Sequence, residues 1–81
     1  MAQERGGKPV DVLTFFQNGK IDPIKFRWNG KVYPVTRINK QWTETQGARH
    51  LYHFIVESNG PDNYELSFDS NKFTWQIVQV A

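Results

Sequence analysis

The feature that most constrains the fold is an Asn-Gly pair, Asn29-Gly30, which separates two runs of alternating apolar and polar residues. Such a pair favours the type I′ turn, in which a two-residue loop joins two antiparallel strands. The turn sets the register because residues equidistant from it must face each other, which pairs Phe26 with Tyr33. One face of this hairpin then collects five large apolar residues and is expected to be buried. These residues are Ile24, Phe26, Trp28, Tyr33 and Val35.

The opposite face of the hairpin is expected to be a basic, half-apolar surface exposed to solvent. Beyond the hairpin, strict alternation would bury Arg37 and expose Ile38, which is unfavourable for both side chains. The sequence therefore predicts a β-bulge near Thr36 or Arg37, which would restore the phase. The exposed hairpin surface is made of Lys25, Arg27, Val32, Pro34 and Thr36.

The rest of the chain continues as short alternating runs separated by turn residues, and helical periodicity is nearly absent. A strand over 49–58 is apolar on both faces, which indicates a central position in a sheet. The sequence predicts an all-β fold, a single small antiparallel meander or partly open barrel of six or seven short strands. The other strands are expected over 10–17, 24–28 and 31–38, around Trp42 after a turn at Asn39-Lys40, from Tyr64 to Asp69, and from Phe73 onward.

A chain of 81 residues has room for one domain with one core. Residues 1–9 are expected to be a flexible leader, and residues 10–81 a single β domain. The absence of cysteine excludes disulfides, and with no signal peptide or membrane segment in the sequence we expect a cytoplasmic protein that does not bind membranes. Large aromatic residues fall on the predicted inner faces and would fill the core: Phe26, Trp28, Tyr33, Phe54, Phe68, Phe73 and Trp75.

The net charge is only +2, but the charges are unevenly distributed along the chain. Residues 1–50 carry nine basic and four acidic side chains, which is +5, while the remainder carries one basic and four acidic side chains, which is −3. A balance of +2 is far below that of a protein that coats DNA, so a mixed, solvated surface is the simpler explanation.

Four segments are distinctive in their order and spacing: Phe26-x-Trp28-x-Gly30-x-x-Tyr33-x-Val35-x-x-Ile38, Trp42, Tyr64-Glu65-Leu66-Ser67-Phe68-Asp69 and Trp75-x-Ile77-x-x-Val80. With them the chain resembles, over roughly residues 10–81, a small bacterial domain family of unknown function that is often encoded beside Y-family translesion DNA polymerases. The resemblance implies a bacterial, cytoplasmic, DNA-repair-associated domain, and it supplies no activity or catalytic residue. Many members carry a longer insertion rich in Trp and Arg where this chain has only Thr43 to Arg49.

Residues that could carry chemistry do not combine into a site. His50 and His53 are three apart, which on a strand places them on opposite faces, so they cannot share a metal ion. His53 is expected at the surface or an edge, and Glu65 on a solvated strand face. None of the serines, Ser67 included, shows the pattern of a histidine–carboxylate relay. We therefore expect no enzyme, no catalytic residue, no metal and no cofactor.

Two non-catalytic functions remain open at this stage. One is an accessory domain that binds single-stranded nucleic acid, with basic side chains on the phosphates and an exposed Trp42 that stacks on a base. The other is a protein interaction module that uses an edge strand or the outer hairpin surface around Val32 and Pro34. The residues predicted to bind nucleic acid are Lys25, Arg27, Arg37, Lys40 and Trp42.

Overall fold

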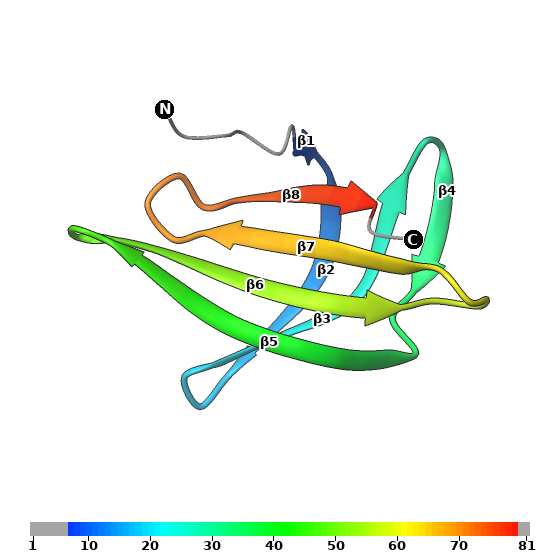
Figure 1. The fold of residues 1–81 in the computed structure, drawn as a ribbon, viewed down its shortest axis with the longest axis horizontal. Helices are drawn as coiled ribbons and strands as arrows, with labels where there is room; N and C mark the ends of the chain where they lie inside the picture. Colours follow the sequence, from blue (N-terminus) through cyan, green and yellow to red (C-terminus); the bar gives the residue numbers. More distant parts are fainter. Residues whose placement is uncertain (1–6, 80–81) are drawn as a thin grey trace.

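The computed structural model describes residues 7–79, which contain antiparallel strands and no helix (Figure 1). The predicted all-β, partly open fold is confirmed, with eight strands in this part of the chain. No helix in residues 7–79 is long and apolar enough to cross a membrane. The strands are β1 (Lys8–Pro9), β2 (Asp11–Gln17), β3 (Lys20–Trp28), β4 (Lys31–Pro34), β5 (Arg37–Gln46), β6 (Arg49–Glu57), β7 (Asn63–Asp69) and β8 (Thr74–Gln79).

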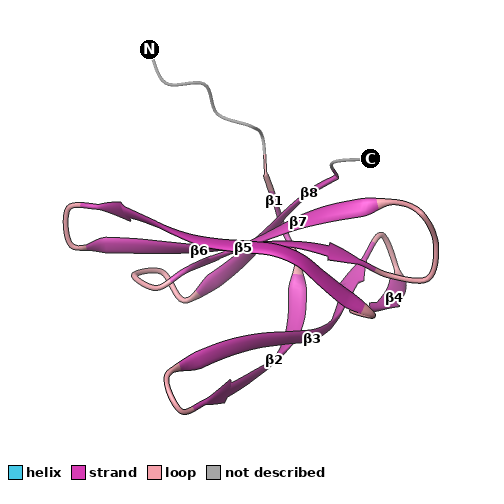
Figure 2. Ribbon diagram, turned by 60° about the horizontal axis from the view of Figure 1, so that its bottom comes forward, coloured by secondary structure: helices cyan, strands magenta, loops and turns pink. Residues whose placement is uncertain are grey.

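The strands form two sheets that lie as layers one over the other (Figure 2). The larger sheet has the order β1-β8-β7-β6-β5, and the smaller has the order β2-β3-β4. The chain passes between them at Val10 and again at residues 35–36. A backbone hydrogen bond to the larger sheet lies at each crossing. Val10 N–H donates to Trp75 C=O at 3.3 Å, and Thr36 N–H donates to Glu57 C=O at 2.9 Å. The sheets are therefore joined at two corners.

The core lies between the two layers and comes mainly from the larger sheet. Phe26 on β3 is 1% exposed and stacks on Tyr33 with ring centroids 5.1 Å apart. It also meets Tyr64 edge-on at 5.4 Å, and burial, followed by the nearby charge of Asp62, raises the pKa of the Tyr64 phenol. Trp28 and Tyr33 are half-buried against this core, as predicted. The buried apolar residues are Phe26, Phe54, Val56, Tyr64, Leu66, Phe68, Trp75 and Ile77.

Two residues that the alternation places inside are exposed. A register shift between β2 and β3 leaves Ile24 as the extra residue of a β-bulge, so the buried inward position passes to Pro23. Phe73 is 70% exposed because it ends a tight turn with φ of 59°, where its N–H donates to the carbonyl of Asp69 at 2.7 Å. Both predictions of burial are wrong because the backbone leaves the regular strand geometry at these points.

The bulge predicted near Thr36 or Arg37 is also wrong, because the chain crosses between the sheets at this point. Val35 N–H still donates to Ile24 C=O of the smaller sheet at 2.8 Å, whereas Thr36 N–H donates to Glu57 C=O of the larger one. The alternation of inward and outward side chains changes phase at Asn39, two residues after Arg37, because the register between β5 and β6 skips Asn39. The turn predicted at Asn39-Lys40 is absent, since β5 runs through this point without interruption.

The predicted hairpin register is confirmed, with Phe26 opposite Tyr33 and Trp28 opposite Lys31. Of the predicted leader, residues 1–6 lie outside the described residues, whereas Lys8 and Pro9 form β1 and pair with β8.

Replacing Gly30 with Val is expected to lower the free energy of unfolding by about 1 to 3 kcal/mol. Gly30 has φ of 76°, in the left-handed region that a β-branched residue resists, although a side chain there would meet no neighbouring atom. Thermal unfolding of the variant measures the effect. An unchanged midpoint would mean that the turn does not need this backbone geometry.

Candidate functional site

The five residues predicted to bind nucleic acid lie on two different sheets. Lys25 and Arg27 project from β3 to the exposed side of the smaller sheet, as predicted. Arg37, Lys40 and Trp42 lie on β5, the edge strand of the larger sheet. The structure therefore presents two separate candidate surfaces.

The first surface is the outer side of the β2-β3-β4 sheet, named here the hairpin face. The register aligns Leu13 with Lys25 and Pro34 in one row across the three strands, and the next row holds Val32. Leu13 and Val32 are 56% and 59% exposed, and Phe15, on the same side of β2, is 58% exposed. Three large apolar side chains thus lie on one sheet face with more than half of their surface in water. The hairpin face is made of Asp11, Leu13, Phe15, Asp22, Lys25, Arg27, Val32 and Pro34.

Charges on the hairpin face largely cancel. Arg27 Nη2 donates to Asp11 Oδ2 at 2.8 Å, and both side chains are well exposed. Such a pair contributes little stability, but it neutralises the positive charge that Arg27 would offer to a phosphate. Asp22, opposite Phe15, offsets the charge of Lys25. The strands thus bring together charges of both signs where the hairpin sequence alone indicated a basic surface.

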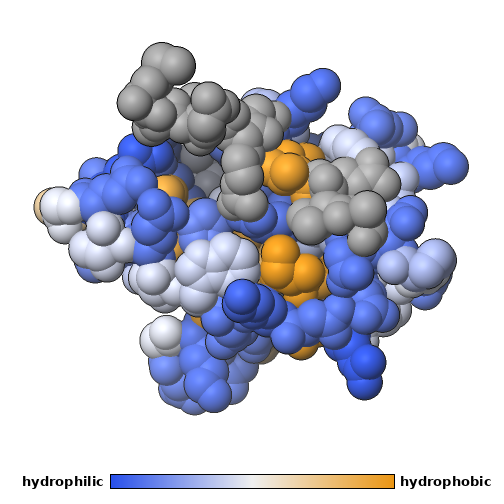
Figure 3. Space-filling view, viewed as in Figure 1, coloured by the Kyte–Doolittle hydropathy of each residue, from blue (hydrophilic) through white to orange (hydrophobic). Residues whose placement is uncertain are grey.

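The second surface is centred on Trp42, on the side of the larger sheet that faces away from β2-β3-β4. Its indole is 37% exposed and stacks on the imidazole of His53, with centroids 4.9 Å apart and planes 13° apart. Lys40 Nζ lies 5.3 Å from the indole centroid, within range of a cation–π interaction. Trp42 is therefore an exposed aromatic residue beside a positive charge, a point that the sequence left open. Figure 3 shows that this side of the molecule is mainly hydrophilic, with hydrophobic side chains gathered near its middle.

Beneath Trp42, a buried polar cluster crosses β5, β6 and β7. His53 Nδ1 lies 3.1 Å from Glu65 Oε2, and His53 Nε2 lies 3.0 Å from Glu44 Oε1. His53 is 6% exposed and Glu65 is 1% exposed, so the predictions that they are solvated are wrong. They are buried because Trp42 stacks on the imidazole, and Glu65 lies between its cross-strand neighbours Ile55 and Val78.

No serine shows the pattern of a histidine–carboxylate relay in the sequence, but the fold brings Ser67 Oγ to 2.9 Å from His53 Nδ1. His53 Nδ1 faces both the Glu65 carboxylate and the Ser67 hydroxyl, and His53 Nε2 faces Glu44. Ser67 Oγ also lies 3.5 Å from Glu65 Oε2, so the hydroxyl joins the imidazole to the buried carboxylate. The cluster satisfies buried polar groups and holds the platform for Trp42.

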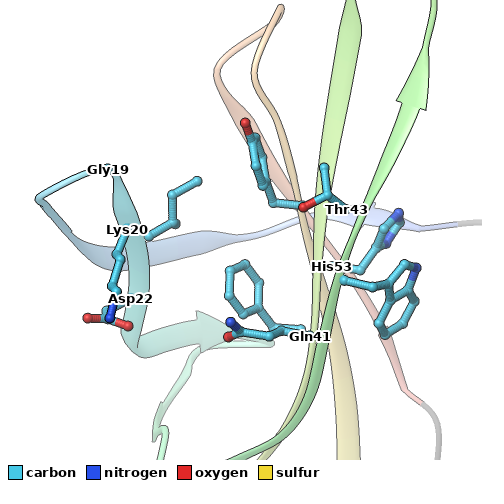
Figure 4. A pocket seen from close by; sticks show the side chains of 10 residues that line it. Gly19, Lys20, Asp22, Gln41, Thr43 and His53 are labelled. Carbon is cyan, nitrogen blue, oxygen red and sulfur yellow. The ribbon is translucent and has the colours of Figure 1, made fainter.

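A cleft of about 410 Å³ separates the end of the β2–β3 hairpin from β5 and β6 (Figure 4). Ile21, Tyr52 and Phe54 line it, together with Gln41 and Thr43 from the edge strand. Figure 4 shows Lys20 and Asp22 on the hairpin side and His53 projecting from the opposite side of the larger sheet. The cleft depends on how the two sheets diverge, so the sequence carried no signal for it.

Asp69 anchors the turn between β7 and β8. Its Oδ1 accepts hydrogen bonds from the N–H groups of Asn71 and Lys72, at 2.9 and 3.2 Å, and its Oδ2 accepts one from Arg49 Nη2 at 2.8 Å. Burial by itself would raise the pKa of this carboxyl, but these donors outweigh it and hold the pKa below its ordinary value.

Within residues 7–79, no group of three His, Asp or Glu side chains is placed to hold a metal ion. No family model, curated protein or solved structure matches the chain. The family resemblance stated above therefore stays a prediction.

Replacing Asp69 with Asn is expected to lower the free energy of unfolding at pH 7 by about 1 to 3 kcal/mol, because charged hydrogen bonds are lost. The folded-state pKa of Asp69 lies below the ordinary value of 3.8, so its contribution is present above that pH and is lost as the pH falls through the folded-state pKa. The difference between the natural chain and the variant should therefore shrink as the pH is lowered from about 5 to about 2.

Urea unfolding at a series of pH values measures this difference. Asp11→Asn is the matched control, because Asp11 also pairs with an arginine but lies exposed on the surface. A difference for Asp69→Asn that is independent of pH would contradict the assignment.

Proposed function

We propose that the chain is a non-catalytic docking domain that binds a protein partner through the hairpin face. The observation that supports this proposal is the exposed apolar group of Leu13, Phe15 and Val32 on a sheet face whose charges are nearly balanced. Desolvating apolar surface drives protein association, and a near-neutral face gives a polyanion little to bind.

The charges on the face define the partner further. Lys25 lies in one row with Leu13 and Pro34, and no carboxylate among residues 7–79 forms an ion pair with it. A partner that buries this row must therefore supply a negative charge to Lys25, because an unpaired buried ammonium is costly. The partner of this proposal is an apolar protein segment that carries Asp or Glu beside its apolar residues.

Selection of a random peptide library on the immobilised protein tests the proposal. The enriched peptides are expected to combine large apolar residues with Asp or Glu, and to shift the amide resonances of β2, β3 and β4. Their affinity should change little between about 50 and 200 mM salt, in contrast to binding through several phosphates. The double variant L13S/V32S is expected to weaken binding at least about tenfold, since it removes two apolar contacts.

Trp42→Ser is the matched control, because it removes an exposed apolar side chain from the other sheet. Peptides that bind L13S/V32S as tightly as the natural chain, or that shift only β5 and β6, would refute docking on the hairpin face.

A second candidate function is binding of single-stranded nucleic acid at the surface centred on Trp42. The observation in its favour is the pair of Lys40 and Trp42, where an ammonium lies beside a partly exposed indole. Base stacking on an aromatic ring and charge contact with a phosphate are the two interactions that such binding combines. Glu44 and Glu57 on the same side weaken this candidate, because they repel phosphates.

Fluorescence anisotropy with a labelled oligonucleotide at low salt tests this candidate. Binding at about 100 μM or below is expected, with loss on Lys40→Ala and no change on the double variant K25E/R27E. Loss of binding in K25E/R27E would place the contact on the hairpin face, as the sequence predicted. No binding by the natural chain would exclude the candidate.

A further inference from the structure

The free edge of β5 carries an unpaired row of backbone groups. β5 is an edge strand of the larger sheet (Figure 1). Every one of its ten residues is exposed. Its first part is distorted by the bulge at Asn39, but the register from Lys40 to Gln46 is regular. This second part contains no Pro, a residue that protects many edge strands from pairing, and its charged residues are Lys40 and Glu44.

The backbone groups that point to the free edge follow from the turn after β5. Gly47 and Ala48 form a two-residue loop, so the carbonyl of Gln46 accepts from the N–H of Arg49 and these residues are a hydrogen-bonded pair. Hydrogen-bonded and non-hydrogen-bonded pairs alternate along an antiparallel ladder. The backbone groups of Gln41 and Thr43 are therefore directed away from β6, toward the edge.

We propose that two copies of this chain associate by antiparallel pairing of their β5 strands about a two-fold axis at Trp42. In this register, Gln41 of each copy faces Thr43 of the other, which joins two residues whose backbone groups both point to the free edge. Lys40 of each copy faces Glu44 of the other. The pairing is self-complementary, as a two-fold interface requires.

Charge complementarity selects this register over its neighbours. Shifting the pairing by two residues in either direction would place Lys40 opposite Trp42 or Gln46 of the second copy, where it meets no carboxylate. In the proposed register the two Lys–Glu pairs lie on either side of the axis, on the same side of the sheet as the indoles. Opposite charges directly across an antiparallel pair are favourable, and aromatic residues across such a pair also attract each other.

The interface is small, so the dimer is expected to form only at high concentration. Sedimentation equilibrium should show the average mass rising from 9.5 kDa toward twice that value between about 5 μM and about 1 mM. Hydrogen exchange gives a second readout on the unaltered chain. The amides of Gln41 and Thr43 should exchange up to about tenfold more slowly at the higher concentration, while the Trp42 amide, which already bonds β6, should not change.

Two variants test the interface directly. Thr43→Pro removes an edge-directed N–H without breaking the β5–β6 ladder, and it should leave the chain monomeric. Lys40→Glu places carboxylates opposite each other and should also leave the chain monomeric. The charge-swapped double variant K40E/E44K restores opposite charges and should restore the dimer. Lys31→Glu is the matched control, because it makes the same charge change on β4, outside the proposed interface.

Glu44 also bonds His53, so thermal unfolding must confirm that K40E/E44K is folded. The hydrogen-exchange measurement uses the natural chain, so it does not depend on whether any variant folds. A constant mass of 9.5 kDa up to about 1 mM would overturn the proposal, and so would a dimer unaffected by Thr43→Pro. A dimer lost only in L13S/V32S would assign self-association to the hairpin face instead.

Discussion

The burial of Phe26 holds the two sheets together. Among the described residues, it is the one fully buried aromatic side chain that the smaller sheet contributes, while the larger sheet supplies the rest of the buried apolar core. Its ring stacks on Tyr33 within its own sheet and meets Tyr64 of the other. Burying one such side chain contributes about 1.5 to 3 kcal/mol. Trp28 and Tyr33 also meet the ring of Tyr64, at 5.9 and 5.7 Å, and Phe16 meets Phe68 at 5.8 Å. Together with the two chain crossings, these contacts hold the inner side of the smaller sheet against the larger one.

The two-layer arrangement explains where the candidate surfaces arise. At the free end of the β2–β3 hairpin the sheets diverge, and the cleft opens between Ile21 and Phe54. On the other side of the same hairpin, Leu13 and Phe15 have no second layer to cover them. One sheet cannot bury both of its faces in a domain of two layers, so apolar residues on an outer face are either tolerated or used for binding.

The outer side of the larger sheet also lacks a covering layer, and the residues buried there are polar. His53 and Glu65 are buried there without a covering layer, because Trp42 stacks on the imidazole and the neighbouring strands enclose the carboxylate. Every buried side-chain nitrogen and oxygen in the described part of the chain has a hydrogen-bond partner. Such a network holds Trp42 and Lys40 in fixed positions beside the free edge of β5, where a ligand or a second copy would meet them.

The sequence by itself determined the elements whose geometry is local. The Asn29-Gly30 turn specified the register of β3 against β4, and the two-residue period identified Phe54, Phe68 and Trp75 as core. Only the tertiary structure decided what covers each face. Period-two alternation assigns a side chain to a face, but whether that face is buried depends on strands that are distant in the chain. For this reason the alternation could not reveal the buried His53–Glu65 pair, the bulge that exposes Ile24, or the division of the basic residues between two sheets.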